Sequence, residues 1–221
     1  MNKLLTTMFA VAVSFATFAV QAQDLTGSAK AGETKNAMCI GCHGIKGYQA
    51  SFPEVYKVPM ISGQGAKYIA SALSAYKKGD RKHPSMRGIA EALSDQDIVD
   101  LAAYYSASGV IAGAELPAEP AKKPSADVLA LLGKANCASC HGANFSKPID
   151  PSYPKLAGQH GDYLFVALKA YKVENNAKVG RNNAIMAGMA KQYTNAELKV
   201  LANYLSSLDG ELKVVPQSRF R

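Results

Sequence analysis

All four cysteines of this 221-residue chain lie in two copies of one five-residue motif. The first copy is Cys39-Ile40-Gly41-Cys42-His43, and the second is Cys137-Ala138-Ser139-Cys140-His141. The C-x-x-C-H pattern is the attachment signal of c-type haem. The two thiols add across the vinyl groups of one haem, and the adjacent histidine becomes an axial ligand of the iron. The two motifs therefore predict two covalently attached haems.

Other uses of paired cysteines fit the chain less well. Two C-x-x-C disulfides are possible in an oxidising compartment. A thioredoxin-like motif would lie in a βαβ pattern, and the sequence has none around either copy. A zinc site usually pairs its cysteine knuckles across about 15–20 residues, whereas Cys42 and Cys137 are 95 positions apart. Haem attachment is the favoured interpretation, with disulfides and zinc as the alternatives.

The motifs belong to a longer internal duplication. Residues 59–64, Pro-Met-Ile-Ser-Gly-Gln, match residues 154–159, Pro-Lys-Leu-Ala-Gly-Gln, at an offset of 95. From Arg81 onward the offset is 100, so that Arg81, Met86 and Gly88 match Arg181, Met186 and Gly188. The chain is therefore predicted to form two homologous domains, each with its own haem.

A second axial ligand is expected in each domain, and the duplication selects among the candidates. Met86 and Met186 occupy equivalent positions, 43 and 45 residues after the histidines of their motifs. The competing side chains have no equivalent ligand in the other domain: Met60 aligns with Lys155, His83 with Asn183, and Met189 with Ile89. A lone methionine is often core filler, as we expect for Met38. We predict His/Met coordination of both irons, by His43 with Met86 and by His141 with Met186, which raises the potential and closes the iron.

Two further pairs of equivalent residues are candidates for supporting roles. The carbonyl of Pro59 or Pro154 is a candidate acceptor for the free N–H of the proximal histidine. Arg81 and Arg181 are candidate partners of haem propionates. Plainer interpretations are that the prolines only make turns and that the arginines are ordinary surface residues.

The elements that must position these residues are predicted to be helices. Thr194–Glu197 is an S/T-x-x-E capping box, and Ser94–Asp97 is its shorter counterpart. Apolar residues then recur with helical spacing at Ile98, Leu101, Ala102 and Tyr105, and at Leu198, Leu201, Ala202 and Leu205. Middle helices are expected near 67–77 and 162–172, and another over 126–135. No stretch alternates like a strand, so the predicted fold class is all-α.

The N-terminus has the features of an export signal. Lys3 is followed by an uncharged, mostly apolar stretch over 4–20, and Val20-Gln21-Ala22 predicts cleavage after Ala22. An uncleaved anchor is the alternative. We therefore expect a soluble, exported chain in the periplasm, with these parts: signal peptide 1–22, first domain 23–112, Pro-rich linker 113–124, and second domain with a short tail 125–221.

The formal net charge of +8 is spread unevenly. Residues 24–112 hold ten Lys/Arg and eight Asp/Glu, and residues 125–221 hold twelve and seven. The basic residues are not interleaved with stacking aromatics, which argues against nucleic-acid binding. A field that steers an acidic protein partner, or an ordinary solvated surface, accounts for the charge.

Taken together, these motifs resemble the dihaem cytochrome c4 family, with two class I cytochrome c domains in tandem. The resemblance is carried by C-x-x-C-H-G, then P-x-[IL]-x-G-Q, then a methionine before a capped final helix, and it covers about 29–208. It implies two lobes with haems near a shared interface. It also implies a non-enzymatic shuttle of single electrons from a quinol-oxidising complex to a terminal oxidase, with possible peripheral membrane association.

Two other functions remain open at this point. Cytochrome subunits of periplasmic dehydrogenases, for example those that oxidise sulfide, are also similar to tandem class I domains. A dihaem peroxidase needs one iron with an open position, and the paired methionines argue against it.

Overall fold

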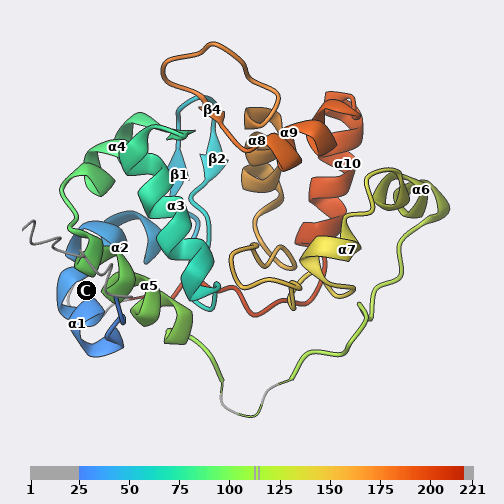
Figure 1. The fold of residues 1–221 in the computed structure, drawn as a ribbon. Coiled ribbons are helices and arrows are strands. Elements are labelled where there is room, and N and C mark those ends of the chain that lie inside the picture. Colours follow the sequence, from blue (N-terminus) through green and yellow to red (C-terminus); the bar gives the residue numbers. More distant parts are fainter. Residues whose placement is uncertain (1–24, 112, 114, 217–221) are drawn as a thin grey trace, which may run out of the picture.

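The computed structural model describes residues 25–111, 113 and 115–216, which form two helical lobes side by side (Figure 1). The predicted signal peptide, 1–22, lies outside the described residues. Within the described ranges no helix is both long enough and apolar enough to cross a membrane.

The two lobes repeat one order of helices. The first lobe contains α1 (Ala29–Lys35), α2 (Ala37–His43), β1 (Gln49–Ala50), β2 (Tyr56–Lys57), α3 (Ala66–Lys78), β3 (Arg81–Lys82), α4 (Pro84–Glu91) and α5 (Asp95–Ala107). The second lobe contains α6 (Ala126–Lys134), α7 (Ala138–His141), α8 (Gly161–Ala170), β4 (Gly180–Arg181), α9 (Ala184–Lys191) and α10 (Asn195–Ser206). The predicted all-α class is confirmed, and the middle helices lie within a few residues of their predicted positions.

The last helix of each lobe forms the centre of its core. Both capping boxes are present: Ser94 with Asp97 begins α5, and Thr194 with Glu197 begins α10. The apolar residues predicted from helical spacing are all buried: Ile98, Leu101, Ala102 and Tyr105 on α5, and Leu198, Leu201, Ala202 and Leu205 on α10. The capping box fixes the residue at which each helix begins. The spacing of the apolar residues that follow determines which face of the helix is buried.

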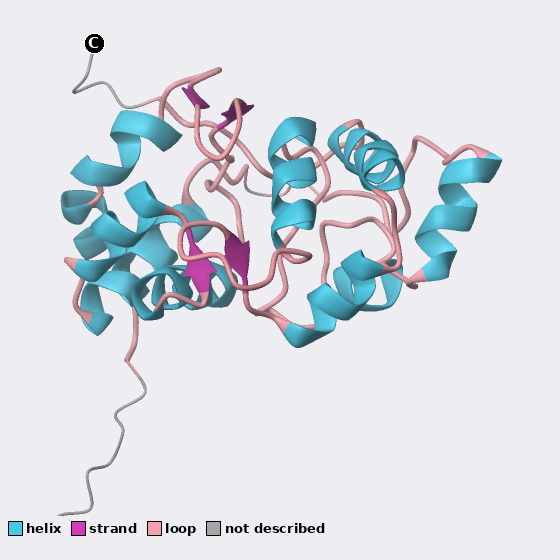
Figure 2. Cartoon of the chain, turned by 90° about the horizontal axis from the view of Figure 1, so that it is seen from above, coloured by secondary structure: helices cyan, strands magenta, loops and turns pink. Residues whose placement is uncertain are grey.

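Four two-residue strands are an addition to the sequence-based prediction. β1 pairs with β2 inside the first lobe, and β3 pairs with β4 across the two lobes (Figure 2). Strands this short contain no alternating pattern, so the sequence carries no signal for them. The β3–β4 pair matters for the site because it places Arg81 opposite Arg181.

The first helix of lobe one packs closely against its last helix. A Cβ added to Gly32 of α1 would lie 2.2 Å from the carbonyl oxygen of Asp100 on α5. Gly32 is buried, and only a residue without a side chain allows this approach of the two backbones. The α1–α5 contact therefore depends on one small residue.

Two segments cross between the lobes. The linker after α5 has no helix or strand in its described residues and is attached to lobe two, where Asn144 donates to Pro117 O (2.8 Å) and Tyr204 donates to Lys122 O (3.1 Å). The chain after α10 returns to lobe one, where Lys213 N donates to Ser62 O (3.0 Å). The segment after α10 therefore connects lobe two back to lobe one, in addition to the covalent linker.

Replacing Gly32 with alanine should unfold lobe one at lower denaturant concentration. The added methyl group meets a backbone carbonyl, so we expect a loss of about 1–3 kcal/mol or more in the free energy of unfolding. The matched control is Gly133→Ala on α6, where nothing lies within 4 Å of the added Cβ. It should be neutral or stabilising by up to about 1 kcal/mol. Equal effects of both changes in chemical denaturation would contradict the packing argument.

Candidate haem-binding sites

The two attachment motifs lie at equivalent places in the lobes. The first forms the C-terminal part of α2, and the second begins at Cys137, just before α7. All four cysteines are free thiols of intermediate exposure, so neither motif forms a disulfide. The described residues contain no group of three or more Cys, His, Asp or Glu side chains that could bind a metal, as a zinc site would require.

The first thiol of each motif faces the apolar core of its lobe. Cys39 packs against the cluster of Ile69, Leu101, Ala102 and Tyr105, and Cys137 packs against the cluster around Phe145 and Leu205. Burial raises the pKa of Cys39 to about 11 and also raises that of Cys137. These thiols are therefore neutral in an apolar setting, which suits a bond to a hydrophobic ring rather than metal–thiolate chemistry.

Both motif histidines are bound by a proline carbonyl, as the sequence predicted. His43 Nδ1 lies 2.8 Å from Pro59 O, and His141 Nδ1 lies 3.0 Å from Pro154 O. Because a carbonyl can only accept, Nδ1 carries the hydrogen and Nε2 keeps a free lone pair. Burial lowers the pKa of both histidines, so the rings are neutral, the form that binds a metal.

The backbone of Met60 lies next to the Nδ1 edge of the His43 ring. It follows Pro59, whose carbonyl is bonded to the ring nitrogen that faces away from the free Nε2. An iron bound at Nε2 would therefore need its second protein ligand from another part of the chain. This placement disfavours Met60 as that ligand.

Met86 and Met186 occupy the same position in their short helices. Each is in the first turn of α4 or α9 and is partly exposed. The backbone N–H of Met86 donates to His83 Nδ1 (3.4 Å), and that of Met186 donates to Asn183 Oδ1 (2.9 Å). The sequence alignment of His83 with Asn183 therefore corresponds to a shared structural role, the N-cap of the methionine helix.

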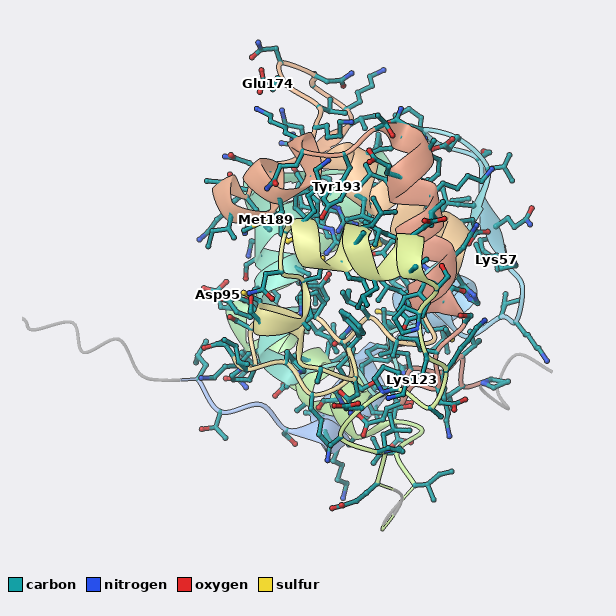
Figure 3. The ribbon with its side chains drawn as sticks, turned by 90° about the vertical axis from the view of Figure 1, so that its right-hand side faces the viewer. Lys57, Asp95, Lys123, Glu174, Met189 and Tyr193 are labelled. Atoms are coloured by element: carbon teal, nitrogen blue, oxygen red, sulfur yellow. The ribbon has the colours of Figure 1, made fainter. Side chains whose placement is uncertain are left out.

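His83 has no nitrogen available for a metal. Its Nδ1 accepts the cap hydrogen bond, and its Nε2 lies 3.0 Å from the Tyr56 hydroxyl and 3.2 Å from Phe52 O. Nε2 must carry the hydrogen because Phe52 O only accepts. The other rival, Met189, lies one turn beyond Met186 on α9, and its sulfur is 3.9 Å from Gln192 Nε2 (Figure 3).

A cluster of arginine and tyrosine side chains lies where the lobes meet. Arg81 and Arg181 stand opposite each other on β3 and β4, and each directs Nη2 to the hydroxyl of Tyr163, at 2.7 and 3.1 Å. Arg81 Nη1 also lies 3.2 Å from the hydroxyl of Tyr68. Tyr68 and Tyr163 are equivalent residues of the two domains, so both lobes contribute alike to this cluster.

The arginine–tyrosine cluster contains no carboxylate among the described residues. Among the described residues no carboxylate pairs with either guanidinium, and the buried Nε of Arg81 has no acceptor. Burial alone would raise the pKa of Tyr163, but the two guanidinium charges outweigh it and lower that pKa to about 7. Haem propionates are the anions that such a site needs. The residues present therefore fit the two haems that the motifs imply.

Two buried glutamines complete the interface, and the sequence did not identify their role. Gln64 Oε1 accepts from Lys155 N (2.9 Å), and its Nε2 donates to Lys155 O (3.0 Å). Gln159 makes the same pair of bonds to Met60 N (3.0 Å) and Met60 O (2.8 Å). Both glutamines belong to the repeated P-x-[IL]-x-G-Q segment, which marks them as shared but says nothing of a partner across the interface.

Comparisons with known proteins agree with this geometry. A family model for cytochrome c matches residues 29–106 and again residues 125–209. Cytochrome c4 of Stutzerimonas stutzeri is 32% identical over 196 residues, covering 82% of this chain and 90% of that protein. The thiosulfate dehydrogenase electron acceptor of Stutzerimonas stutzeri (strain A1501) is 28% identical and covers 77% of this chain and 78% of its own length.

A solved structure supports the same arrangement. The crystal structure of reduced recombinant cytochrome c4 from Pseudomonas stutzeri superposes with a TM-score of 0.61 at 27% identity. The match covers 83% of this chain and 100% of that one. Both tandem lobes therefore take part in the similarity.

The cap at His83 yields a pH-dependent prediction. Burial lowers the pKa of His83 in the folded chain, so protonation favours the unfolded state. The stabilising contribution of neutral His83 is fully present above the unfolded pKa of about 6.5. It is lost as the pH falls from that value toward the lower pKa of the folded chain, by up to about 1.4 kcal/mol per pH unit. His83→Asn, which copies Asn183, should keep the cap without this dependence, and His83→Ala should be about 1 kcal/mol less stable than His83→Asn at either pH.

Chemical denaturation at pH 7.5 and 5.5 tests this, because the other histidines titrate equally in all three proteins. The wild type should lose stability relative to His83→Asn at the lower pH. An unchanged difference between the two would show that His83 does not cap as a neutral ring.

Proposed function

Because this chain belongs to the cytochrome c4 family, as a dihaem electron-transfer protein of two tandem cytochrome c domains, we propose that it shuttles single electrons in the periplasm between a quinol-oxidising complex and a terminal oxidase. The export signal at 1–22 and the domain limits 23–112 and 125–221 are part of this proposal. When bound, each covalent haem supplies an iron that alternates between Fe(III) and Fe(II).

The proposed site residues are the same set in each lobe. They are Cys39, Cys42, His43 and Met86 in lobe one, and Cys137, Cys140, His141 and Met186 in lobe two. The observation that carries the proposal is that both lobes hold a neutral histidine by a proline carbonyl and cap the helix of an equivalent methionine. Histidine and methionine together would hold each iron through two protein ligands, which would suit electron transfer and would leave no open position for a peroxidase reaction.

The interface supports exchange of electrons within the molecule. Arg81 and Arg181, the residues that would hold propionates of the two haems, meet at one tyrosine hydroxyl. Ion pairs between lobes, Glu54 with Lys169 and Lys57 with Asp162, add to the cross-lobe β3–β4 pairing. The two haem sites are thus held in one fixed relation by the protein.

Exposed apolar side chains beside the attachment motifs support brief docking to other proteins. Met38, which is 68% exposed, and Ile45 flank the first motif. Ile149 is exposed in lobe two, and its backbone N–H donates to Cys140 O (3.1 Å). Small apolar patches of this kind are suited to weak, short-lived contacts with redox partners.

A second candidate function has support from the comparisons. Similarity to a thiosulfate dehydrogenase electron acceptor favours a role in receiving electrons from a periplasmic dehydrogenase. The sulfide-oxidising flavoenzymes considered from sequence are of the same general type. In either case the chain carries electrons and leaves the substrate chemistry to its partner.

Methionine coordination predicts a spectroscopic loss in one lobe at a time. Oxidised wild type should show the sulfur-to-iron band near the red end of the visible spectrum. Met86→Ala or Met186→Ala should each remove one half of it and lower the potential of that haem alone, because the thioether favours Fe(II). The rivals Met60→Ala and Met189→Ala are the matched controls. Loss of the band in Met60→Ala with its retention in Met86→Ala would show that the alignment of the two domains is wrong.

The electron-carrier proposal predicts rapid oxidation of the reduced protein by respiratory membranes of the source organism. Stopped-flow absorbance should show reoxidation that an oxidase inhibitor abolishes, and quinol with the same membranes should reduce the protein again. In the comparison experiment, the oxidised protein is mixed with the soluble periplasmic fraction and thiosulfate or sulfide. Reduction by that fraction, with no exchange with membranes, would instead support the dehydrogenase-acceptor role.

A further inference from the structure

Each interface glutamine binds a peptide group that also holds a haem-site histidine. In the peptide between Pro59 and Met60, the carbonyl accepts from His43 while the N–H donates to Gln159 of the other lobe. The peptide between Pro154 and Lys155 does the same for His141 and for Gln64 of lobe one. The two contacts therefore cross: each lobe's glutamine reaches the other lobe's histidine through one rigid peptide.

We infer that Gln64 and Gln159 are positioning residues that each lower the reduction potential of the haem in the opposite lobe. The inference rests on the proposed coordination of the irons by His43 and His141. Gln159 acts on the haem of Cys39 and Cys42, although it belongs to the second domain.

The physical link is polarisation of the shared peptide. When an amide N–H donates a hydrogen bond, the carbonyl of the same amide becomes a stronger acceptor, by about 10–30% per bond. A stronger acceptor at Nδ1–H makes the imidazole a more basic ligand, which favours Fe(III) over Fe(II). The oxygen of Gln159 thus lowers the potential at His43, and loss of that oxygen raises it.

The geometry of the glutamines leaves little freedom for other roles. Gln64 is 4% exposed and Gln159 is 3% exposed. Each Oε1 also accepts from the N–H of its own next residue, Gly65 at 2.9 Å and His160 at 3.0 Å. Since these backbone groups can only donate, the orientation of both amides is fixed, with oxygen toward the shared peptide.

The test compares potentials of the two haems in single variants of the mature holoprotein. NMR at stepped potentials follows each haem, and Met86 and Met186 variants assign the resonances. Gln159→Leu should raise the potential of the haem on Cys39 and Cys42 and leave the other nearly unchanged. Gln64→Leu should do the reverse.

A second pair of variants gives the opposite sign and covers the case in which leucine prevents folding. Gln159→Glu keeps the acceptor but loses the donor to Met60 O, and burial raises the pKa of the new carboxyl. Measured at high pH, where this carboxyl is ionised, the variant should lower the potential at Cys39 and Cys42 more than at the second haem. Gln64→Glu should again be the mirror image. Loosening of the interface cannot explain opposite shifts from leucine and glutamate at the same haem.

The control is Glu54→Gln, which removes the interlobe ion pair with Lys169 without touching either shared peptide. It should shift both potentials slightly and alike. Shifts in the glutamine variants that are equal at both haems, larger in the variant's own lobe, or absent would overturn the inference. A wild type that lacks two covalent haems, or lacks the sulfur-to-iron band in either lobe, would overturn the proposed function instead, so the two failures can be told apart.

Discussion

The hydrogen bond from each motif histidine to a proline carbonyl is the contact on which the rest of both lobes depends. It joins the attachment motif to the P-x-[IL]-x-G-Q segment, whose glutamine then reaches across the interface. It fixes the tautomer of the ring and therefore the side of the ring on which a metal can bind. Domains of this size bury only a small core, so a prosthetic group tied to this contact contributes to stability as well as to function.

The interface differs from a typical hydrophobic contact between domains. Its centre holds paired strands, two guanidiniums, shared tyrosines and two glutamine amides whose oxygen and nitrogen both make hydrogen bonds. Polar contacts need defined distances and angles, so they fix the relative placement of the lobes more closely than apolar packing alone. Arg81 and Arg181 bring two positive charges to this interface, where their described hydrogen-bond acceptors are tyrosine hydroxyls.

The sequence predicted the local features well, because each has a local physical cause. The capping boxes at Ser94 and Thr194 start their helices as expected, and the apolar faces that follow are buried. The duplication also led correctly to the proline carbonyls. It could not reveal the β3–β4 pair or the targets of Gln64 and Gln159, because these contacts join residues about a hundred positions apart and leave no spacing pattern. The residue type of His83 makes it a possible ligand, whereas in the structure it is a helix cap, a role that its counterpart Asn183 shares.

The reciprocal contacts have a consequence for the origin of the molecule. In β3–β4, Arg81 faces Arg181, its own counterpart in the duplication, and each glutamine binds the residue after the counterpart proline. In an isologous interface, which has a two-fold axis, both copies use the same surface, so that every contact occurs twice with the roles of the two copies exchanged. Two copies of a single-domain ancestor paired in this way would have had the same interface before their genes were fused. The linker would then have made permanent, at fixed stoichiometry, a homodimer that already existed.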